Sequence, residues 1–338
     1  MHTNIAMPSM PMVRALMIAP WMASAQSLGA PAEALLGRAG IRPEVLRHAT
    51  AAVPLKKVFC WIELVCRSLG TEHLGLDVGC ATRYEDFGHY GRMVLSALTL
   101  REYLQKGISL YSTVVVGQSF WLSAHGAQVR LNLSAPWDPE LGDYQAYLNS
   151  FAIVIASIRR FAGPGWAPSE ISFGFRAREA IPVADIFGGT RVVYRPGQTY
   201  IEFPRAMLGL RLPHRAPAVA AGQPALSRPL PKDLAGLVEL QIESLLSGGA
   251  LSIDLVAESL GMTRRSLQRG LAVQGVSYTD LLAAVRVRRA ATWLECTDKP
   301  VVEIALDLGY TDASNFTRAF RRQTGVSPTA FRDTAGRD

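Results

Sequence analysis

The strongest constraint on this chain is a stretch near its C-terminus that reads IALDLGYTDASNFTRAFR from Ile304. Ile304 and Leu308 are four residues apart and share one apolar helix face, and Gly309 follows at a point where a chain reversal needs a left-handed residue. Phe316 and Phe320 have the same spacing, which predicts a second helix packed against the first. The pattern therefore predicts a helix-turn-helix.

The same unit occurs twice. Gly261 lies 48 residues before Gly309, and the Gly-Val-Ser triplet that closes each unit recurs at a spacing of 50, at Gly275 and Gly325. A single amphipathic helix pair with a solvated charged face is common and indicates no particular function. Duplication of the pair, with basic and polar residues on the outer side of both second helices, indicates DNA binding.

One long helix is predicted between the two units, from Tyr278 to Glu295, with a cap formed by Ser277 and Asp280. Roughly 17 residues at about 1.5 Å each span about 26 Å. A strut of that length suits two recognition helices held near the ~34 Å repeat of successive major grooves. We therefore expect both second helices to enter the same face of one duplex.

Residues from about 233 to 332 resemble the DNA-binding domain of the AraC/XylS family of bacterial transcription regulators. The matching residues of the second unit are Ile304-Ala305, Gly309-Tyr310, Ser314, Phe316, Arg318, Phe320-Arg321, Gly325, Ser327-Pro328 and Phe331-Arg332. The resemblance implies that the first recognition helix reads bases through Arg265, Gln268 and Arg269, and the second through Ser314, Asn315 and Arg318. The full set expected at the DNA is Arg264, Arg265, Gln268, Arg269, Ser314, Asn315, Thr317, Arg318 and Arg321.

The resemblance also implies the partners and setting of the protein. These are double-stranded promoter DNA, RNA polymerase, a small-molecule effector, a second copy of the chain in a homodimer, and a cytoplasmic location. Activation is an action that the family shows, although the sequence leaves the direction of regulation open. Gly270 lies inside the first recognition helix, where glycine costs about 1 kcal/mol relative to alanine, so we expect that helix to be the more mobile reader.

The N-terminal part is expected to be an α+β domain, because its predicted helices and strands are segregated in runs. Residues 1–12 are expected to be disordered, and residues 13–212 to form the domain. Its predicted helices are 13–28, 32–38, 43–48, 55–69, 87–98, 100–111 and 139–161, and its predicted strands are 112–124, 128–134, 170–175, 191–194 and 199–203. A proline-rich linker, 213–231, leads to an all-α DNA-binding domain, 232–333, with two helix-turn-helix motifs joined by the long helix.

The N-terminal domain is similar to the arabinose-binding-like effector domain found in one branch of the same family. The similarity rests on three elements: Leu36 to Ile41, Phe87-Gly88 with Gly91 and the Leu98 to Glu102 step, and Tyr200 to Leu208. It implies effector binding and dimerisation, but it says little about the ligand and does not imply a sugar. A regulator without an effector, whose N-terminal domain only dimerises or binds a protein partner, is the alternative.

Aromatic side chains are the first candidates for an effector site. Tyr90, Tyr103, Tyr111 and Phe120 are simply explained as core residues, and Trp121, on a predicted strand, is the one residue that we assign to the effector. A second group suits a charged effector, but each of its members is more simply a solvated or paired charge. This group comprises Asp86, Arg92, Arg130 and Arg178.

No cofactor, metal site or enzymatic activity is expected. His73, His89 and His125 share no helix face, and the four cysteines are too widely spaced for a zinc cluster or a disulfide scaffold. Nucleophile and base residues form no local motif, although a triad assembled in space would escape this reading. An enzyme fused to a DNA-binding unit would need such a constellation in the N-terminal domain.

Charge does not mark the DNA-binding domain as a whole. The chain carries a net charge of +7, yet residues 233–338 contain 12 Lys and Arg against 13 Asp and Glu. The arginines cluster at 264–269, 286–289 and 318–322, so we expect local positive faces. The apolar run near the N-terminus is broken by Pro20, and we expect neither a secretion signal nor a membrane span.

Overall fold

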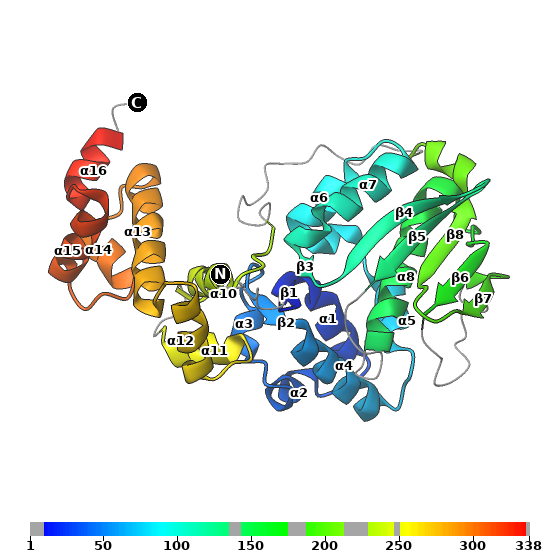
Figure 1. Ribbon diagram of the computed structural model, residues 1–338, viewed down its shortest axis with the longest axis horizontal. Helices are drawn as coiled ribbons and strands as arrows, with labels where there is room; N and C mark the ends of the chain where they lie inside the picture. The colour runs from blue at the N-terminus through cyan, green and yellow to red at the C-terminus, as the bar shows by residue number, and fades with distance from the viewer. Residues whose placement is uncertain (1–9, 135–142, 175–186, 213–228, 247–250, 336–338) are drawn as a thin grey trace, which may run out of the picture. The chain divides into compact units, whose positions relative to one another are not determined.

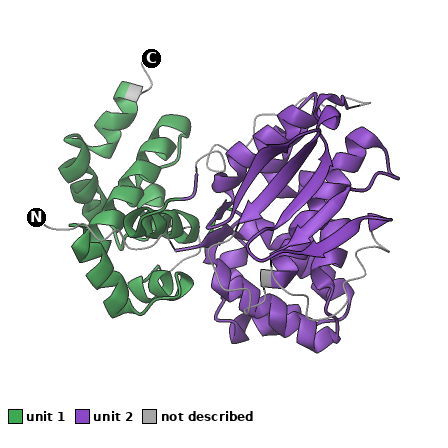
Figure 2. Cartoon of the chain, turned by 45° about the vertical axis from the view of Figure 1, so that its right-hand side comes forward, with its two compact units in different colours: residues 1–7, 50–52, 231–338 green, residues 8–49, 53–230 purple. Residues whose placement is uncertain are grey.

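The computed structural model describes residues 10–134, 143–174, 187–212, 229–246 and 251–335. Their helices and strands are labelled in Figure 1. The chain divides into two compact units, which Figure 2 shows in separate colours. Unit 1 comprises Met1–Met7, Thr50–Ala52 and Pro231–Asp338, and unit 2 comprises Pro8–Ala49 and Val53–Leu230.

The central element of unit 2 is a five-stranded sheet with the order β4-β5-β8-β6-β7. Only the β6–β7 pair is parallel. The strands are β4 (Ser119–His125), β5 (Gln128–Ser134), β6 (Glu170–Phe173), β7 (Arg191–Tyr194) and β8 (Tyr200–Pro204). The predictions for 128–134 and 191–194 are confirmed, and Gly126, with a φ of 60°, lies in the turn of the hairpin that joins β4 to β5.

The strand predicted over 112–124 is wrong in its first half. Gly117 adopts a φ of 101°, a conformation open to glycine, and interrupts the extended chain there. The segment before it forms the 3-10 turn η3 (Tyr111–Thr113) and the short strand β3 (Val115–Val116). β4 begins only at Ser119.

The alternation of β5 gives the sheet an apolar and a polar face. Val129, Leu131 and Leu133 are each buried, at 3–4% exposure, while Arg130 and Asn132 point to the opposite side. Helix α8 (Asp143–Ala162) lies on the apolar face (Figure 1), where the ring of Phe151 packs 5.4 Å from that of Phe173. The predicted helix 139–161 is confirmed within the described residues, and its first four residues lie outside them.

The remaining helices of unit 2 form a layer around α8 and the sheet edge. They are α1 (Ala19–Ser27), α2 (Ala32–Arg38), α3 (Pro43–Leu46), α4 (Leu55–Leu69), α5 (Leu74–Ala81), α6 (Gly88–Leu95) and α7 (Leu100–Leu110), with the 3-10 turns η2 (Tyr84–Phe87) and η4 (Arg205–Gly209). α4 has its predicted bounds, and α7 begins as predicted at Leu100, after a cap in which Thr99 accepts from the backbone N–H of Glu102.

Helix α5 was not predicted, because its two glycines weaken the helical signal. They are required by packing: a Cβ at Gly75 would lie 2.1 Å from a backbone oxygen of Gln145, and one at Gly79 would lie 2.5 Å from the Cβ of Ala152. The close approach of α5 to α8 also lets the Gln145 side chain accept from the Gly75 N–H at 2.7 Å. Two neighbouring helices are thereby fixed against each other.

The beginning of unit 2 differs from the single helix predicted over 13–28. A strand β1 (Met12–Arg14) pairs with β3 and is followed by the turn η1 (Ala15–Met17) before α1 starts. Arg14 explains the strand: its side chain is 1% exposed and its Nε donates to the Thr113 carbonyl at 2.5 Å. Of the predicted disordered segment, residues 1–9 lie outside the described residues, but Met12 is fully buried.

Within its described residues, the C-terminal part of unit 1 is entirely helical, as predicted. Its helices are α10 (Leu234–Leu245), α11 (Ile253–Ser259), α12 (Arg264–Val273), α13 (Tyr278–Cys296), α14 (Val301–Asp307), α15 (Ala313–Thr324) and α16 (Pro328–Ala335). α13 is the predicted strut, and its 19 residues extend about 28 Å.

Unit 1 also takes in Thr50–Ala52, which no sequence pattern indicated. The fully buried side chain of Gln241 accepts from the Ala52 N–H at 3.1 Å and donates to the Ala52 carbonyl at 2.9 Å. The same amide donates to Ser259 at 2.8 Å. Every polar group of the Gln241 side chain is therefore satisfied inside unit 1.

None of the helices in the described parts of the chain combines the length and apolar character that a bilayer crossing requires.

Candidate nucleic-acid interface and ligand cavity

Both helix-turn-helix units adopt the local geometry that the sequence predicts. Gly261 and Gly309 turn the chain with φ values of 71° and 75°. The second helix of each unit then starts at a side-chain cap. Thr263 accepts from the N–H of Ser266 at 3.1 Å on α12, and Asp312 accepts from the N–H of Asn315 at 2.7 Å on α15.

Every residue expected at the DNA lies on α12 or α15. The buried faces of these helices carry Leu267 with Leu271 and Phe316 with Phe320, so the polar residues point outward. The exposed residues are Arg264, Arg265, Gln268, Arg269, Ser314, Asn315, Arg318 and Arg321, and Thr317 is half-buried on the flank of α15. The structure thus brings four candidates together on one helix and five on the other.

Arg264 and the arginines of α13 have structural partners. Arg264 lies 3.5 Å from Asp254 of α11. Arg286 donates to the Gly309 carbonyl at 3.2 Å, and its guanidinium lies 4.7 Å from the centre of the Tyr310 ring. These contacts tie α13 to the turn of the second helix-turn-helix motif. The sequence predicts a positive face at the arginine cluster 286–289. Arg286 instead holds the second helix-turn-helix motif against α13.

Arg288 ties α13 to α10, the helix that precedes the first helix-turn-helix motif. It donates to Glu239 at 2.8 Å and to Glu243 at 3.0 Å, both on α10. Arg286 and Arg288 are two residues apart near the middle of α13, so this stretch of the strut contacts both α10 and the turn at Gly309. These contacts and the buried residues of α13 hold the two helix-turn-helix motifs on one strut.

A chain of hydrogen bonds joins three exposed residues at the start of α15. The Asn315 amide donates to the Asp312 carboxylate at 2.5 Å, and its oxygen accepts from Arg318 at 2.6 Å. Both ends of the Asn315 amide are therefore engaged within the protein. Arg318 retains further N–H donors that face outward, so it can still form a bidentate contact with a guanine edge.

Gly270 of α12 has a packing role that sequence reasoning missed. A Cβ at this position would lie 2.5 Å from Cδ2 of Leu234 on α10. The glycine lets α12 approach α10 closely. Gly270 therefore has a packing contact as its structural explanation, and greater mobility of this helix stays a prediction.

Unit 2 contains a cavity of about 80 Å³ between α6, α7, α8 and the apolar face of the sheet. Six aromatic rings contribute to its wall. They are Tyr84, Phe87, Tyr90, Tyr103, Tyr111 and Phe120. Tyr111 and Phe120 contact each other edge to face with ring centres 4.9 Å apart, and Tyr84 and Tyr90 stack with centres 6.1 Å apart. The aromatic residues that we considered for a pocket do line one, with the exception of Trp121.

Polar groups of this wall are few and uncharged. Tyr90 donates to the Gly107 carbonyl at 3.3 Å, and Tyr111 donates to Gln118 at 2.7 Å. Burial raises the pKa of Tyr90, Tyr103 and Tyr111 above the usual tyrosine value, so these hydroxyls stay protonated. The Nδ2 atom of Asn149 is buried and has no hydrogen-bond partner within the described part of the protein.

Trp121 lies outside this cavity. It is 45% exposed on the polar side of β4 and borders an open groove with Gln105 and Lys106 of α7. Its register partner across the hairpin is Asn132, whose amide donates to the Trp121 carbonyl at 3.2 Å. An effector contact by Trp121 stays a prediction, and it would belong to that groove.

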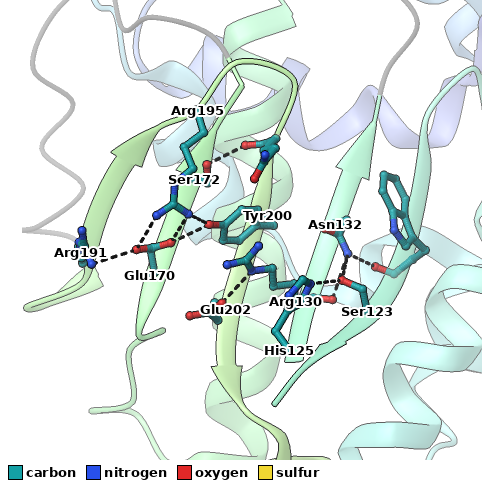
Figure 3. Close-up of polar contacts among 12 residues, drawn as sticks. Ser123, His125, Arg130, Asn132, Glu170, Ser172, Arg191, Arg195, Tyr200 and Glu202 are labelled. Atoms are coloured by element: carbon teal, nitrogen blue, oxygen red, sulfur yellow. Dashed lines mark hydrogen bonds and ion pairs between the residues drawn. The ribbon is translucent and has the colours of Figure 1, made fainter. Parts of the chain in front are cut away.

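The polar face of the sheet is a network of paired charges, shown in Figure 3. Arg130 forms a 2.7 Å ion pair with Glu202 and stacks 4.0 Å over the ring of Tyr200. Glu170, which is 6% exposed, accepts from the Tyr200 hydroxyl and from Arg195, both at 2.7 Å. Arg130 is thus a paired charge, consistent with the simpler of the two roles that we considered.

The other candidates for a charged effector do not converge on this face. Asp86 accepts from the N–H of Arg83 at 2.9 Å and so serves as a cap. Arg92 belongs to α6, and Arg178 lies outside the described residues. Within the described parts of the chain, no three metal-ligating side chains lie close enough together to hold a metal ion. Burial raises the pKa of Cys66 to about 12, so this thiol is a core residue.

The comparisons with known proteins agree with this architecture. The arabinose-binding domain of AraC transcription regulators, N-terminal, matches residues 29–212, more than half of the chain, and a helix-turn-helix domain matches residues 256–334. The ornithine utilization regulator of Pseudomonas aeruginosa is 28% identical over 319 residues, covering 90% of this chain and 91% of that protein. The regulatory protein SoxS of Escherichia coli is 39% identical over 85 residues, covering 24% of this chain and 78% of that protein.

Among solved structures, the transcriptional regulator CdpR from Pseudomonas aeruginosa is 24% identical and covers 77% of this chain and 86% of its own, with a TM-score of 0.36. Three findings agree on the family. One family model matches the N-terminal part, a second matches the helix-turn-helix region, and one regulator is similar over nine-tenths of the chain. This chain belongs to the AraC family of transcription regulators.

Proposed function

We propose that the protein binds promoter DNA through α12 and α15, placed in successive major grooves of one duplex. The observation that carries the proposal is the duplicated helix pair, with an outward polar set on each second helix and one strut between them. Base contacts are assigned to Arg265, Gln268 and Arg269 on α12 and to Ser314 and Arg318 on α15, with Asn315 bound to Arg318 beside them. Arg264, Thr317 and Arg321 are assigned to the flanking phosphates.

The domain boundaries that we propose are 13–212 for effector binding and dimerisation, 213–231 for the linker and 232–333 for DNA binding. We infer that a small molecule bound in the N-terminal domain shifts the population between domain arrangements of different DNA affinity. A homodimer, contact with RNA polymerase, activation of transcription and a cytoplasmic location complete the proposal. The 28% identical relative is an ornithine utilization regulator, which makes ornithine one compound to test.

Selection of bound sequences from a random DNA pool tests the DNA-binding part. We expect enrichment of two short half-sites about one helical turn apart, ~10 base pairs centre to centre. The full chain should bind the enriched sequence at least ~10³-fold more tightly than random DNA at a fixed salt concentration. Failure to enrich any sequence, with folded protein, would refute the proposal. Binding that no small molecule alters would favour the effector-independent alternative.

A further inference from the structure

The cavity of unit 2 restricts the chemical class of the effector. This inference rests on the proposed function, because it assumes that a small molecule controls the protein. Within the described residues that line the cavity, none carries a charge, and the wall is formed mainly by aromatic and aliphatic side chains. A charged ligand would have to lose its hydration without gaining a counter-charge, which is strongly unfavourable.

The size of the space indicates one ring. A second cavity of about 70 Å³ adjoins the first, and both are bordered by Met17, Phe87, Tyr111, Asn149, Ser150 and Ile153. Met17 is an unbranched, flexible side chain, so a small rotation there can join the two spaces. Together they would reach about 150 Å³, the volume of an apolar cavity that accommodates benzene.

The side chain of Asn149 offers a hydrogen-bond donor to a ligand in the cavity. Its Nδ2 donor is buried on α8 in the wall that both cavities share, and it lacks a partner among the described residues. A buried donor of this kind is destabilising until an acceptor reaches it. A carbonyl, ether or hydroxyl oxygen on an otherwise apolar molecule would meet it.

We propose that the effector is an uncharged, largely apolar molecule of about one ring, with a hydrogen-bond acceptor directed at Asn149. The six aromatic rings enclose its apolar part and the Asn149 amide orients it. This excludes ornithine, which carries two ammonium groups and one carboxylate, as the ligand of this cavity. It also separates this chain from any relative whose effector is a charged amino acid.

Four probes test the class by isothermal titration and thermal unfolding of the full chain. Acetophenone has a ring and an acceptor, ethylbenzene keeps the ring without the acceptor, benzoate adds a charge, and ornithine is charged and has no ring. We expect acetophenone to bind most tightly and to raise the unfolding temperature, ethylbenzene to bind about tenfold more weakly, and the charged compounds to give no shift. Tighter binding of benzoate or ornithine, or no binding of either neutral ring, would overturn the proposal.

Three variants test whether acetophenone binds in this cavity. Ser150→Phe fills the shared wall and should abolish acetophenone binding. Asn149→Leu should weaken acetophenone about tenfold and leave ethylbenzene unchanged, and this second readout guards against a variant that merely unfolds. Leu28→Ala is the matched control, since Leu28 is 51% exposed and lines neither cavity, and should bind acetophenone like the unsubstituted chain. If Asn149→Leu weakens the binding of acetophenone and of ethylbenzene equally, Asn149 does not donate a hydrogen bond to the ligand and that assignment is wrong.

DNA binding is measured on the same samples so that the two proposals fail separately. If acetophenone binds but no DNA sequence is enriched, the proposed function is wrong and the cavity assignment stands. If DNA binds specifically and only a charged compound alters that binding, the proposed function stands and the effector class is wrong.

Discussion

Asn315 and Arg318 should act at the DNA as one unit, which a double-mutant cycle can measure. In the free protein the Asn315 amide donates to Asp312 and accepts from Arg318, at 2.5 and 2.6 Å. Reading an adenine with both ends of the amide would break both bonds, at about 1 kcal/mol or more each, against a gain of ~1–3 kcal/mol from the base. The two terms cancel, so we expect Asn315 to position Arg318 and not to read a base of its own.

The expected magnitudes follow from that geometry. Arg318→Ala should cost ~1–3 kcal/mol of binding to the selected DNA if Arg318 contacts a guanine. Asn315→Ala should cost about 1 kcal/mol through a loosened Arg318. The double variant should then bind like Arg318→Ala alone, with a coupling energy of about 1 kcal/mol. Helix α15 keeps its cap in Asn315→Ala, because Asp312 caps the backbone N–H of Asn315 and not its side chain.

Fluorescence anisotropy with the selected duplex at constant salt gives the four affinities. The control cycle pairs Arg318→Ala with Gln268→Ala on the other recognition helix, where the effects should add within ~0.5 kcal/mol. If Asn315 and Arg318 are equally additive, the two residues read bases independently and the positioning role is refuted. An additive result would also restore Asn315 to the base-reading set that the family resemblance implies.

Four further outcomes are expected. Arg286→Lys should weaken binding to the two-half-site DNA more than to a single half-site, measured by anisotropy, because the second unit loses its tie to the strut. Gly270→Ala should destabilise the fold by about 1 kcal/mol in chemical denaturation, since overpacking at ~1–3 kcal/mol outweighs a helix-propensity gain of ~1 kcal/mol. Gln241→Leu should cost ~2–4 kcal/mol in the same assay, because two buried backbone groups lose their partner. Iodoacetamide at pH 9 should label Cys60 and spare Cys66, as measured by mass spectrometry. Because the pKa of Cys66 is raised in the folded chain, its thiol ionises first in the unfolded chain above about pH 9. Ionisation of Cys66 should therefore lower the free energy of unfolding as the pH rises.

The helix-turn-helix units could be predicted because their determinants are local. In the second unit, Gly309 makes the turn while Phe316 and Phe320 mark the buried face, all within a dozen residues. Helical periodicity then leaves the polar residues on the outside without any knowledge of the rest of the fold. The same reasoning predicted the strut from Tyr278 to Glu295, one residue short of the observed Tyr278–Cys296, because its cap and its apolar spacing are also local.

Elements that depend on distant partners were missed. β1 exists because Arg14 and its neighbours pair with a segment about a hundred residues later, and α5 tolerates Gly75 because α8 approaches it. The inclusion of Thr50–Ala52 in unit 1 depends on Gln241, 189 residues further along the chain. No window of sequence contains both members of any of these pairs.

The cavity is non-local in the same sense, and this limits what the family resemblance can say about the effector. Its wall draws Met17, Tyr90, Phe120 and Asn149 from four separate elements, so a substitution in any of them reshapes it without altering a recognisable motif. At 28% identity the relative named for ornithine utilization can share the fold and the DNA-binding unit while lining its cavity differently. The effector therefore has to be deduced from the uncharged wall of this chain, and that wall favours a neutral ring.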